Sequence, residues 1–257
     1  MLEVGLVDLH ERCLFSRTVM SSVLTTMTTS TLSFSLSINN RIDRATVYTA
    51  KRGLSEKVRF VKGDFMKMPF PDNTFDRVYS IEATCHAPSL TGVYSEIFRV
   101  LKPGGTYATY EWLLDDAYDA SNPRHRQISY DIEIGDGIPC MVKKSVALAA
   151  FKEVGFGAPI FEEDLADMGD EIPWYYPIEG ATKYTNRWAD WWKILLMTKT
   201  ARYLSHGMLG VLGACRLAPP DARKIANAMG QAADALVAGG KVKLFTPMQL
   251  YVVQKPE

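Results

Sequence analysis

Residues 72–112 have the sequence DNTFDRVYSIEATCHAPSLTGVYSEIFRVLKPGGTYATYEW, and this stretch decides the fold. It contains an apolar run of strand length over 75–81, followed by apolar residues at helical spacing from Leu90 to Leu101. Lys-Pro-Gly-Gly at 102–105 stops that helix, and a second strand follows over 106–112. A strand, a crossover helix and a second strand in this order predict two parallel strands of an α/β sheet.

The alternation of helices and strands extends to both sides of this stretch. Upstream, Asn39 or Asn40 is expected to cap a helix over 42–51 that ends at Gly53, and a short strand is expected over 58–61. Downstream we expect four further elements: a helix over 145–154, a strand near 158–161, mostly helical sequence over 182–237 and a last strand over 244–253. We predict one sheet that contains strands 58–61, 75–81 and 106–112, with 244–253 beside them and a mostly helical insertion before that last strand.

Composition limits the class of protein. The 257 residues carry 29 basic and 29 acidic side chains, and zero net charge argues against a nucleic-acid-binding protein, which usually has a basic excess. The four cysteines form no CxxC pair, so they indicate reduced thiols of an intracellular protein, not a disulfide framework or a zinc site. The longest apolar run, 191–197, is interrupted by Lys193 and is far shorter than the roughly 20 residues that span a bilayer. The sequence therefore predicts a protein that is soluble or lies on a membrane surface.

Polar residues follow each predicted strand. They are Asn39-Asn40 after the apolar stretch 32–38, Gly63-Asp64-Phe65 after 58–61, Glu82-Ala83-Thr84-Cys85-His86 after 75–81, and Glu111-Trp112 at the end of the strand from Thr106. Ligands of open α/β sheets bind beyond the carboxyl ends of the strands, so these segments are expected to face one crevice. Amides and carboxylates suit the ribose hydroxyls and the adenine amino group of a nucleoside. Each segment alone is more simply a helix cap or a turn, but four at consecutive strand ends favour a nucleoside site.

Several segments resemble known methyltransferases. Lys-Pro-Gly-Gly at 102–105 and Asp72–Asp76 resemble class I methyltransferases in general. Other segments resemble the sterol 24-C-methyltransferases: Ile81–Pro88 (IEATCHAP), Tyr110–Trp112 (YEW), Gly135–Pro139 (GDGIP), Asp170–Pro177 (DEIPWYYP), Gly239–Lys241 (GGK) and Lys243–Met248 (KLFTPM). The resemblance extends from about Asn39 to Pro256, and its most specific parts are the octapeptide and the aromatic segment.

This resemblance implies a Rossmann-like class I methyltransferase sheet, S-adenosyl-L-methionine as the cofactor and a sterol as the substrate. In the implied reaction, C-24 of a side-chain double bond attacks the methyl group of the sulfonium, the methyl–sulfur bond breaks and a carbocation remains. A hydride shift follows and a proton is lost, without a metal or a serine or cysteine nucleophile. The candidate cofactor-binding residues are Asn39, Asn40, Asp64, Phe65 and Glu82. Carboxylates stabilise a cation and a histidine can accept the final proton, so the candidate catalytic residues are Glu82, His86, Glu111 and Asp170. A histidine that is simply packed at the start of a loop is an equally good interpretation of His86.

The N-terminal segment departs from the family. Residues 1–5 resemble the start of the family's glycine-rich cofactor loop, yet no glycine occurs between Gly5 and Gly53. Residues 12–42 contain no acid and many Ser and Thr, so a leader-like segment, a solvated stretch and a misread gene segment stay open as interpretations. We expect three parts: 1–38 as a divergent, damaged or truncated segment, 39–165 as the methyltransferase core, and 166–257 as the sterol methyltransferase C-terminal region, with 244–253 returning to the sheet.

Two other functions stay open: a catalytically impaired sterol-binding remnant that lacks the cofactor loop, and a methyltransferase for another small acceptor. Trp188, Trp191, Trp192, Leu195 and Leu196 lie near one helical face, which usually packs in a core and alternatively faces a sterol or lipid. The resemblance implies a peripheral location at the endoplasmic reticulum or lipid-droplet surface, and otherwise the cytoplasm. It is compatible with peripheral membrane association and with a homo-oligomer.

Overall fold

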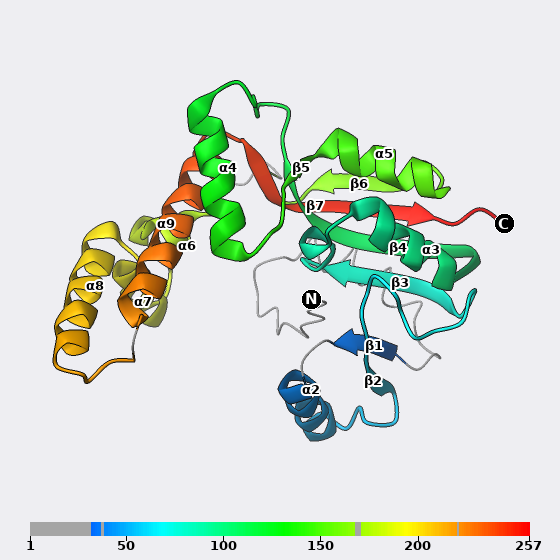
Figure 1. The fold of residues 1–257 in the computed structure, drawn as a ribbon, viewed down its shortest axis with the longest axis horizontal. Coiled ribbons are helices and arrows are strands. Elements are labelled where there is room, and N and C mark those ends of the chain that lie inside the picture. The colour runs from blue at the N-terminus through cyan, green and yellow to red at the C-terminus, as the bar shows by residue number, and fades with distance from the viewer. Residues whose placement is uncertain (1–31, 37–38, 168–170, 220) are drawn as a thin grey trace. The chain divides into compact units, whose positions relative to one another are not determined.

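The computed structural model describes residues 32–36, 39–167, 171–219 and 221–257 (Figure 1). These residues belong to two compact units. The first contains the residues up to Glu111 together with 148–165 and 249–257, and the second contains 112–147 and 166–248. None of the described helices is long and apolar enough to cross a membrane.

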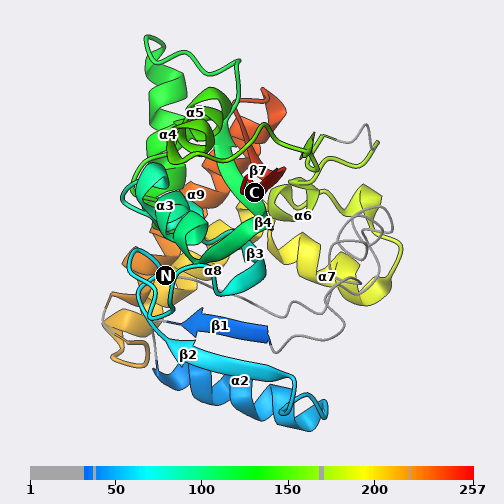
Figure 2. The same cartoon turned by 90° about the vertical axis from the view of Figure 1, so that its right-hand side faces the viewer.

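A parallel βαβ unit begins the described chain. β1 (Leu32–Leu36) pairs in parallel with β2 (Val58–Lys62), and α2 (Asn39–Lys51) connects them (Figure 2). Gly53 follows the helix with a φ of +67°, a left-handed conformation that glycine adopts without a steric penalty. The predicted helix is confirmed, although it begins at Asn39, earlier than the sequence pattern indicated.

The larger sheet has five strands, four of them in the order β3-β4-β7-β6. β3 (Phe75–Ile81) and β4 (Leu101–Leu114) are parallel and are connected by α3 (Leu90–Val100). β7 (Phe245–Gln254) joins β4, and β6 (Phe161–Asp164) pairs with β7 in antiparallel orientation. β5 (Val142–Lys143) pairs with the end of β4, and α5 (Lys144–Val154) follows it. The prediction that the last strand lies beside 106–112 is confirmed.

One strand is not where the sequence predicted it. Val58–Lys62 pairs with β1 in a sheet of two strands, and within the described residues it does not pair with β3. The prediction of a single sheet that holds both 58–61 and 75–81 is therefore wrong for these residues. Periodicity identifies a strand from its own side chains, whereas the partner of a strand depends on hydrogen bonds to residues far away in the chain.

Two glycines shape the start of β4. Gly104 has a φ of +74°, and a Cβ on Gly105 would lie 2.8 Å from the carbonyl oxygen of Lys102. The register shifts at this point, because Phe75 is paired with Leu101 but Arg77 is paired with Thr106. The Pro-Gly-Gly segment is therefore an irregularity inside β4. The sequence pattern had instead predicted that this segment precedes the strand.

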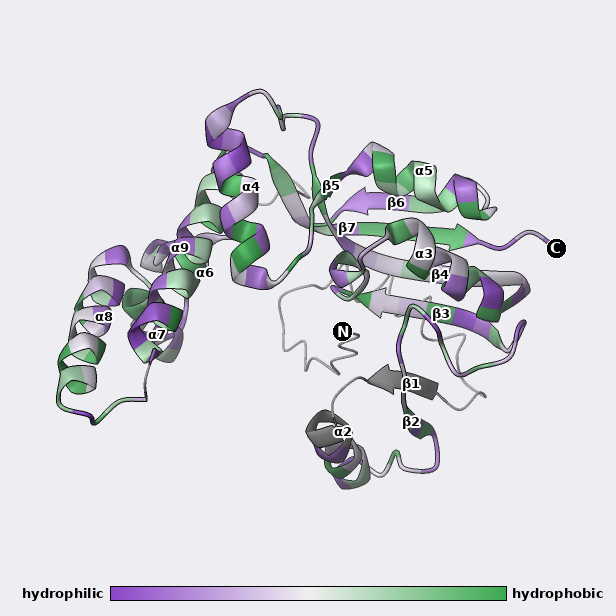
Figure 3. Cartoon of the chain, viewed as in Figure 1, coloured by the Kyte–Doolittle hydropathy of each residue, from purple (hydrophilic) through white to green (hydrophobic). Residues whose placement is uncertain are grey.

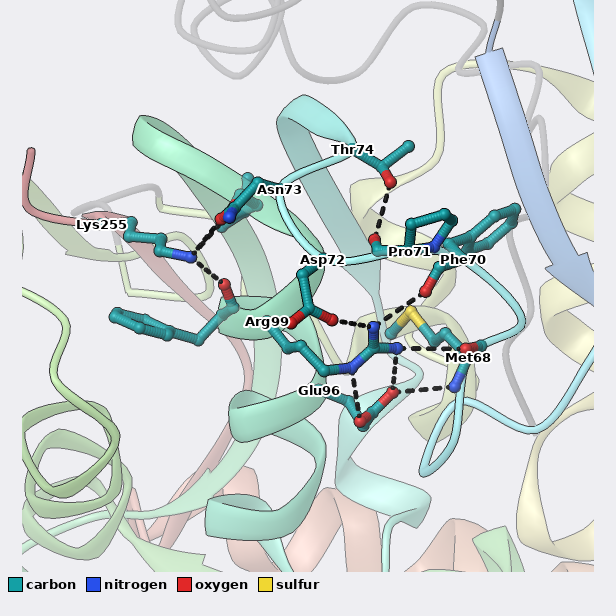
Figure 4. Close-up of polar contacts among 11 residues, drawn as sticks. Met68, Phe70, Pro71, Asp72, Asn73, Thr74, Glu96, Arg99 and Lys255 are labelled. Atoms are coloured by element: carbon teal, nitrogen blue, oxygen red, sulfur yellow. Dashed lines mark hydrogen bonds and ion pairs between the residues drawn. The ribbon is translucent and has the colours of Figure 1, made fainter.

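Arg99 anchors the loop that leads from β2 to β3 (Figure 4). Its guanidinium donates to both carboxylate oxygens of Glu96, at 3.0 and 2.9 Å, and to the carboxylate of Asp72 at 2.7 Å. It also donates to the carbonyl oxygens of Phe70 and Met68, at 2.8 and 3.1 Å. The planar guanidinium suits such a set of acceptors, and it fixes the chain just before β3.

Aromatic side chains form much of the core of the first unit. Tyr94 of α3 stacks on Phe151 of α5 with ring centroids 4.2 Å apart, and Tyr107 and Tyr251 pack edge-on against the same phenylalanine. The alternate positions Ala108 and Tyr110 of β4 belong to a different cluster, with Leu250 and Val252 of β7. The period of two along β4 therefore separates two faces, and Tyr107, Thr109 and Glu111 share the face that meets Tyr94.

The second unit is mostly helical. α4 (Pro123–Asp136) packs on α9 (Ala222–Lys241), and a Cβ on Gly135 would lie 2.0 Å from the Cβ of Ala232. α8 (Lys199–Ala214), α7 (Trp188–Leu196), the short α6 (Tyr176–Glu179) and the 3₁₀ turn η2 (Thr182–Tyr184) complete the unit. The prediction of mostly helical sequence over 182–237 is confirmed.

Candidate functional site

The parallel registers place candidate residues in two pairs. In the smaller sheet Leu36 is opposite Lys62, so Asn39 and Asp64 both follow the carboxyl ends of paired strands. In the larger sheet Ile81 is opposite Tyr110, and Glu82 and Glu111 are the residues that come next. Because parallel strands end at the same edge of a sheet, each pair lies at one such edge.

Glu82 directly follows β3 and has a left-handed backbone. Its φ is +49°, its backbone N–H donates to the carbonyl oxygen of Tyr110 at 3.3 Å, and its side chain is exposed. A non-glycine residue in this region costs on the order of 1–3 kcal/mol, and such strain is concentrated at functional sites. The turn leads into the 3₁₀ helix η1 (Thr84–His86), which ends with the half-buried His86.

Glu111 is fully buried, with none of its surface exposed. Its Oε1 accepts hydrogen bonds from three hydroxyl groups, those of Thr84 at 2.5 Å, Tyr94 at 2.7 Å and Thr109 at 3.2 Å. Its Oε2 has no hydrogen-bond partner among the described residues. Tyr94 comes from α3 and Thr84 from η1, so this single carboxylate joins both elements to β4.

The hydroxyl network extends beyond Glu111. Ser80 Oγ lies 2.6 Å from Thr109 Oγ1 and 2.7 Å from the hydroxyl oxygen of Tyr107. The sequence analysis missed Ser80, Tyr94 and Thr109 as partners of Glu111. A signal was present for Thr109 alone, because Tyr107, Thr109 and Glu111 alternate with period two along one strand.

Burial sets the ionisation of this region. It raises the pKa of Glu111 to about 7, although its three hydroxyl donors lower it. Burial and the nearby charges of Glu111 and then Glu82 raise the pKa of Cys85 to about 12, so this thiol stays protonated and unreactive at neutral pH. Burial and the charge of Glu111 also raise the pKa of Tyr94 well above its ordinary value. A reaction that uses a cysteine nucleophile at Cys85 is disfavoured.

The other candidate residues differ in how far the structure describes them. Asp64 is exposed, and its Oδ1 accepts from the backbone N–H of Met66 at 2.8 Å in a tight turn, while the neighbouring Phe65 is buried. Asn39 and Asn40 begin α2, where only their backbone is described. Asp170 lies outside the described residues.

Two lysines of the second unit form ion pairs with Asp167 and Glu179. Lys243 Nζ lies 2.5 Å from Asp167 Oδ2, and Lys241 forms an ion pair with Glu179. In both pairs the lysine lies more than sixty residues away from its carboxylate in the sequence.

The Gly239-Gly240 pair lets α9 approach the aromatic segment. A Cβ on Gly240 would lie 2.5 Å from Tyr175 Cδ1 and 3.0 Å from Trp174 Cζ2. A Cβ on Gly239 would lie 2.9 Å from the ring of Phe245, and that ring packs edge-on against Trp174. Two segments that the sequence analysis singled out separately are thus in direct contact within the second unit.

The second unit also contains a cavity of about 670 Å³ between α8 and α9. Its lining is mixed, with Lys199, Arg202 and Arg223 supplying positive charge and Asp131 and Asp234 supplying negative charge. Arg202 is bonded to Asp234 at 2.5 Å and to the carbonyl oxygen of Gly230 at 2.8 Å.

Comparison with known proteins adds a second line of observation. The family described as "Methyltransferase domain" matches residues 28–109, and the family described as "Sterol methyltransferase C-terminal" matches 192–257. A sterol 24-C-methyltransferase of Neurospora crassa is 55% identical over 216 residues, which are 84% of this chain and 57% of that protein. The chain belongs to the sterol 24-C-methyltransferase family.

A yeast relative matches a similar share of the chain. The sterol 24-C-methyltransferase of Saccharomyces cerevisiae is 52% identical over 225 residues, 86% of this chain and 58% of that protein. The chain thus spans somewhat more than half the length of these relatives.

Solved structures confirm the predicted fold class. A geranyl diphosphate methyltransferase in complex with SAM has a TM-score of 0.57 at 14% identity, over 91% of this chain and 73% of that chain. A geranyl diphosphate C-methyltransferase from Streptomyces coelicolor, in complex with S-adenosyl-L-homocysteine, has a TM-score of 0.56 at 15% identity, over 91% and 66%. This family member therefore has the α/β, Rossmann-like fold of class I methyltransferases.

Proposed function

We propose that this protein transfers a methyl group from S-adenosyl-L-methionine to C-24 of a sterol side chain. The observation that carries the proposal is the position of Glu82 and Glu111, each directly after one residue of the paired Ile81 and Tyr110, in a chain that is 55% identical to a sterol 24-C-methyltransferase. We also propose that residues 39–165 are the methyltransferase core and 166–257 the sterol-specific region.

The carboxylates at the strand ends suit the hydrogen-bond donors of the cofactor. Asp64 is exposed and has lone pairs beyond the one used by Met66, and Glu82 is an exposed carboxylate. Such groups accept hydrogen bonds from ribose hydroxyls and from an adenine amino group. Asn39 and Asn40, at the first turn of α2, and the buried Phe65 beside Asp64 complete the proposed set. When bound, S-adenosyl-L-methionine supplies an electrophilic methyl group on a sulfonium.

Each acidic or basic side chain has a distinct proposed role. The exposed carboxylate of Glu82 opposes the positive charge that develops on the sterol side chain. His86, four residues further on, accepts the proton that ends the reaction. Glu111 acts through Thr84, because its hydrogen bond to that hydroxyl holds η1, and with it His86, in place. Asp170, two residues before Ile172 and close in sequence to Trp174, is proposed as a second carboxylate for the cation.

The proposed substrate also suggests a location. A sterol is insoluble in water, so we propose that the protein works at the surface of the endoplasmic reticulum or a lipid droplet, attached peripherally. Assembly into a homo-oligomer is a further proposal for the intact enzyme.

Methyl transfer from labelled cofactor to a sterol with a side-chain double bond tests the function. The assay should compare three proteins: this chain, the Neurospora crassa relative, and a chimera in which residues 1–31 are replaced by the corresponding part of that relative. We expect label on the sterol with the relative and the chimera and little with the chain as written, because its N-terminal segment lacks glycine.

The outcomes separate the alternatives. Label on the sterol with the chimera, and its loss in the chimera's Glu82→Gln variant, support the proposed site. A chimera that binds the cofactor but labels only another small acceptor would contradict the proposed substrate. A chimera that binds sterol and transfers no methyl group would favour a sterol-binding protein without catalysis.

A further inference from the structure

Large hydrophobic side chains are exposed in unusual number on three helices of the second unit. Eleven of the nineteen exposed large hydrophobic residues in the described part of the chain lie between Trp188 and Met229. Trp188 is 86% exposed, Leu204 71% and Val211 65%. All sixteen residues of α8 are described, and none is buried. Clusters of this kind on a folded protein mark a surface that meets another apolar phase or partner.

The exposed residues form stripes along α7 and α8. Trp188, Trp192 and Leu196 recur at intervals of four, which places them on one side of α7. These three side chains are exposed, whereas Ile194 of the same helix is buried. On α8, Leu204, Met208 and Val211 recur at intervals of four and three. Figure 3 shows the hydrophobic colouring of the second half of α8. We call these six residues the apolar face.

The α8 stripe points away from the partner helix. His206 of α8 lies against Gly230 of α9, since a Cβ on that glycine would be 3.1 Å from the imidazole. At about 100° per residue, Leu204, Met208 and Val211 lie roughly 140–200° around α8 from His206. The contact between α8 and α9 therefore leaves these residues uncovered.

The part of the chain that carries the apolar face has an excess of basic residues. From Arg187 to Lys224 the sequence has seven Lys or Arg residues and two acids, although the whole chain is neutral. Each of the two acids, Asp190 and Asp221, is paired with a nearby lysine. Lys199 and Arg202 pair with Asp234, and Arg223 lines the cavity between α8 and α9. Arg216 has no ion-pair partner among the described residues, and Lys193 is 77% exposed beside the tryptophans. This combination of tryptophan, aliphatic residues and excess positive charge suits an anionic lipid surface.

The charge also argues against a second copy of the chain as the occupant. A two-fold dimer places the same patch on both sides of its interface. Such an arrangement would bring the two cationic surfaces together, and like charges in contact oppose association.

We propose that the apolar face of α7 and α8, together with Lys193 and Arg216, docks the protein on an anionic phospholipid surface. The helices lie in the plane of the interface. The indoles of Trp188 and Trp192 enter the boundary between headgroups and acyl chains, and the basic side chains contact the headgroup phosphates. The apolar face shares no residue with those proposed for methyl transfer.

Vesicle co-sedimentation of the full chain, without cofactor or sterol, tests the proposal. Vesicles of phosphatidylcholine alone are compared with vesicles that also contain phosphatidylserine. We expect binding that is stronger with phosphatidylserine and that weakens as salt is added. A blue shift of tryptophan fluorescence should accompany binding, because the exposed indoles leave water.

Two double variants and a matched control locate the surface. Trp192→Gln with Leu204→Gln should weaken binding to both kinds of vesicle by about tenfold or more. Lys193→Gln with Arg216→Gln should weaken binding to the anionic vesicles by roughly 30-fold and leave binding to phosphatidylcholine little changed. Ile134→Gln with Ile160→Gln, at two residues that are each 63% exposed elsewhere, should leave binding as it is.

Four results would overturn the proposal. They are no vesicle binding by the unaltered chain, unchanged binding by the Trp192/Leu204 variant, an equal loss with the control variant, and a dimer in size-exclusion chromatography that the Trp192/Leu204 changes dissociate. The last result would assign the face to contact between two copies. Vesicle binding by a chimera that transfers no methyl group would contradict the proposed function and support this surface.

Discussion

The hydroxyl of Thr84 donates a 2.5 Å hydrogen bond to the fully buried carboxylate of Glu111, and this bond joins the turn after β3 to the end of β4. Burial raises the pKa of Glu111 to about 7, from 4.5 for an ordinary glutamate. The charge state of a group that holds the candidate site together therefore changes near neutral pH.

Stability should fall as the pH rises through this window. Below about pH 4.5 Glu111 is protonated in the folded and unfolded states alike, and between about 4.5 and 7 only the unfolded state releases the proton. The free energy of unfolding should therefore decrease by about 3 kcal/mol across the window and level off above it. Glu111→Gln stays neutral, so it should match the unaltered chain near pH 4.5 and be more stable above pH 7. Urea unfolding at a series of pH values measures this, with the exposed Glu162→Gln as control. Parallel pH profiles for the two glutamine variants would contradict the assignment.

Glu82 should be replaceable by glycine at no cost in stability. Its φ of +49° strains any residue with a Cβ, so Glu82→Gly should leave the chain equally stable or more stable, by about 0.5–1 kcal/mol. In the active chimera the same change should abolish methyl transfer, because the carboxylate is lost. Thermal unfolding and the labelling assay together test the point. A clear loss of stability would show that the carboxylate has a structural role instead.

The chain as written should bind S-adenosyl-L-methionine weakly. No glycine occurs from Leu6 to Leu36, where the family's backbone comes close to the cofactor. Each lost hydrogen bond to a charged ligand group costs about 1.5–3 kcal/mol, so two losses lower affinity by about two orders of magnitude or more. Calorimetric titration against the Neurospora crassa relative measures the difference. Equal affinities would mean that this N-terminal sequence forms a competent cofactor loop.

Arg99 should contribute more to the free energy of unfolding than an exposed ion pair of the same unit does. Arg99→Lys keeps the charge but loses the planar set of contacts to Glu96, Asp72 and two carbonyl groups, and should cost about 1–3 kcal/mol (Figure 4). Lys102→Gln removes only the exposed pair with Asp76 and should cost less than about 1 kcal/mol. Urea unfolding of the two variants measures both costs. Equal costs would show that the loop before β3 is held by other contacts.

Gly240 should not tolerate a side chain. The new Cβ of Gly240→Ala would lie 2.5 Å from Tyr175, so the change should cost about 1–3 kcal/mol and alter the fluorescence of Trp174. Gly207→Ala, in a helix interior with open space around it, should instead stabilise the chain by about 0.5–1 kcal/mol. Thermal unfolding compares the two. A harmless Gly240→Ala would contradict the close approach of α9 to the aromatic segment.

Local patterns in the chain predicted most of its elements. The helix over 90–100, the strands over 75–81 and 106–112 and the helical stretch before the last strand follow from apolar periodicity and from the Pro-Gly-Gly turn. The alternation of strands and helices, and the segments that resemble class I methyltransferases, predicted the fold class.

Tertiary structure decided which of these residues touch. Glu111 is bonded to Thr84 and Tyr94, residues seventeen or more positions away, and Asp167 is bonded to Lys243, seventy-six positions away. The pairing of 58–62 with 32–36, the raised pKa of Glu111 and the packing of α9 on Trp174 likewise depend on long-range contacts. A sequence pattern records the preference of each residue for its immediate neighbours. Burial, hydrogen-bond partners and charge state are properties of the packed chain, so only the fold determines them.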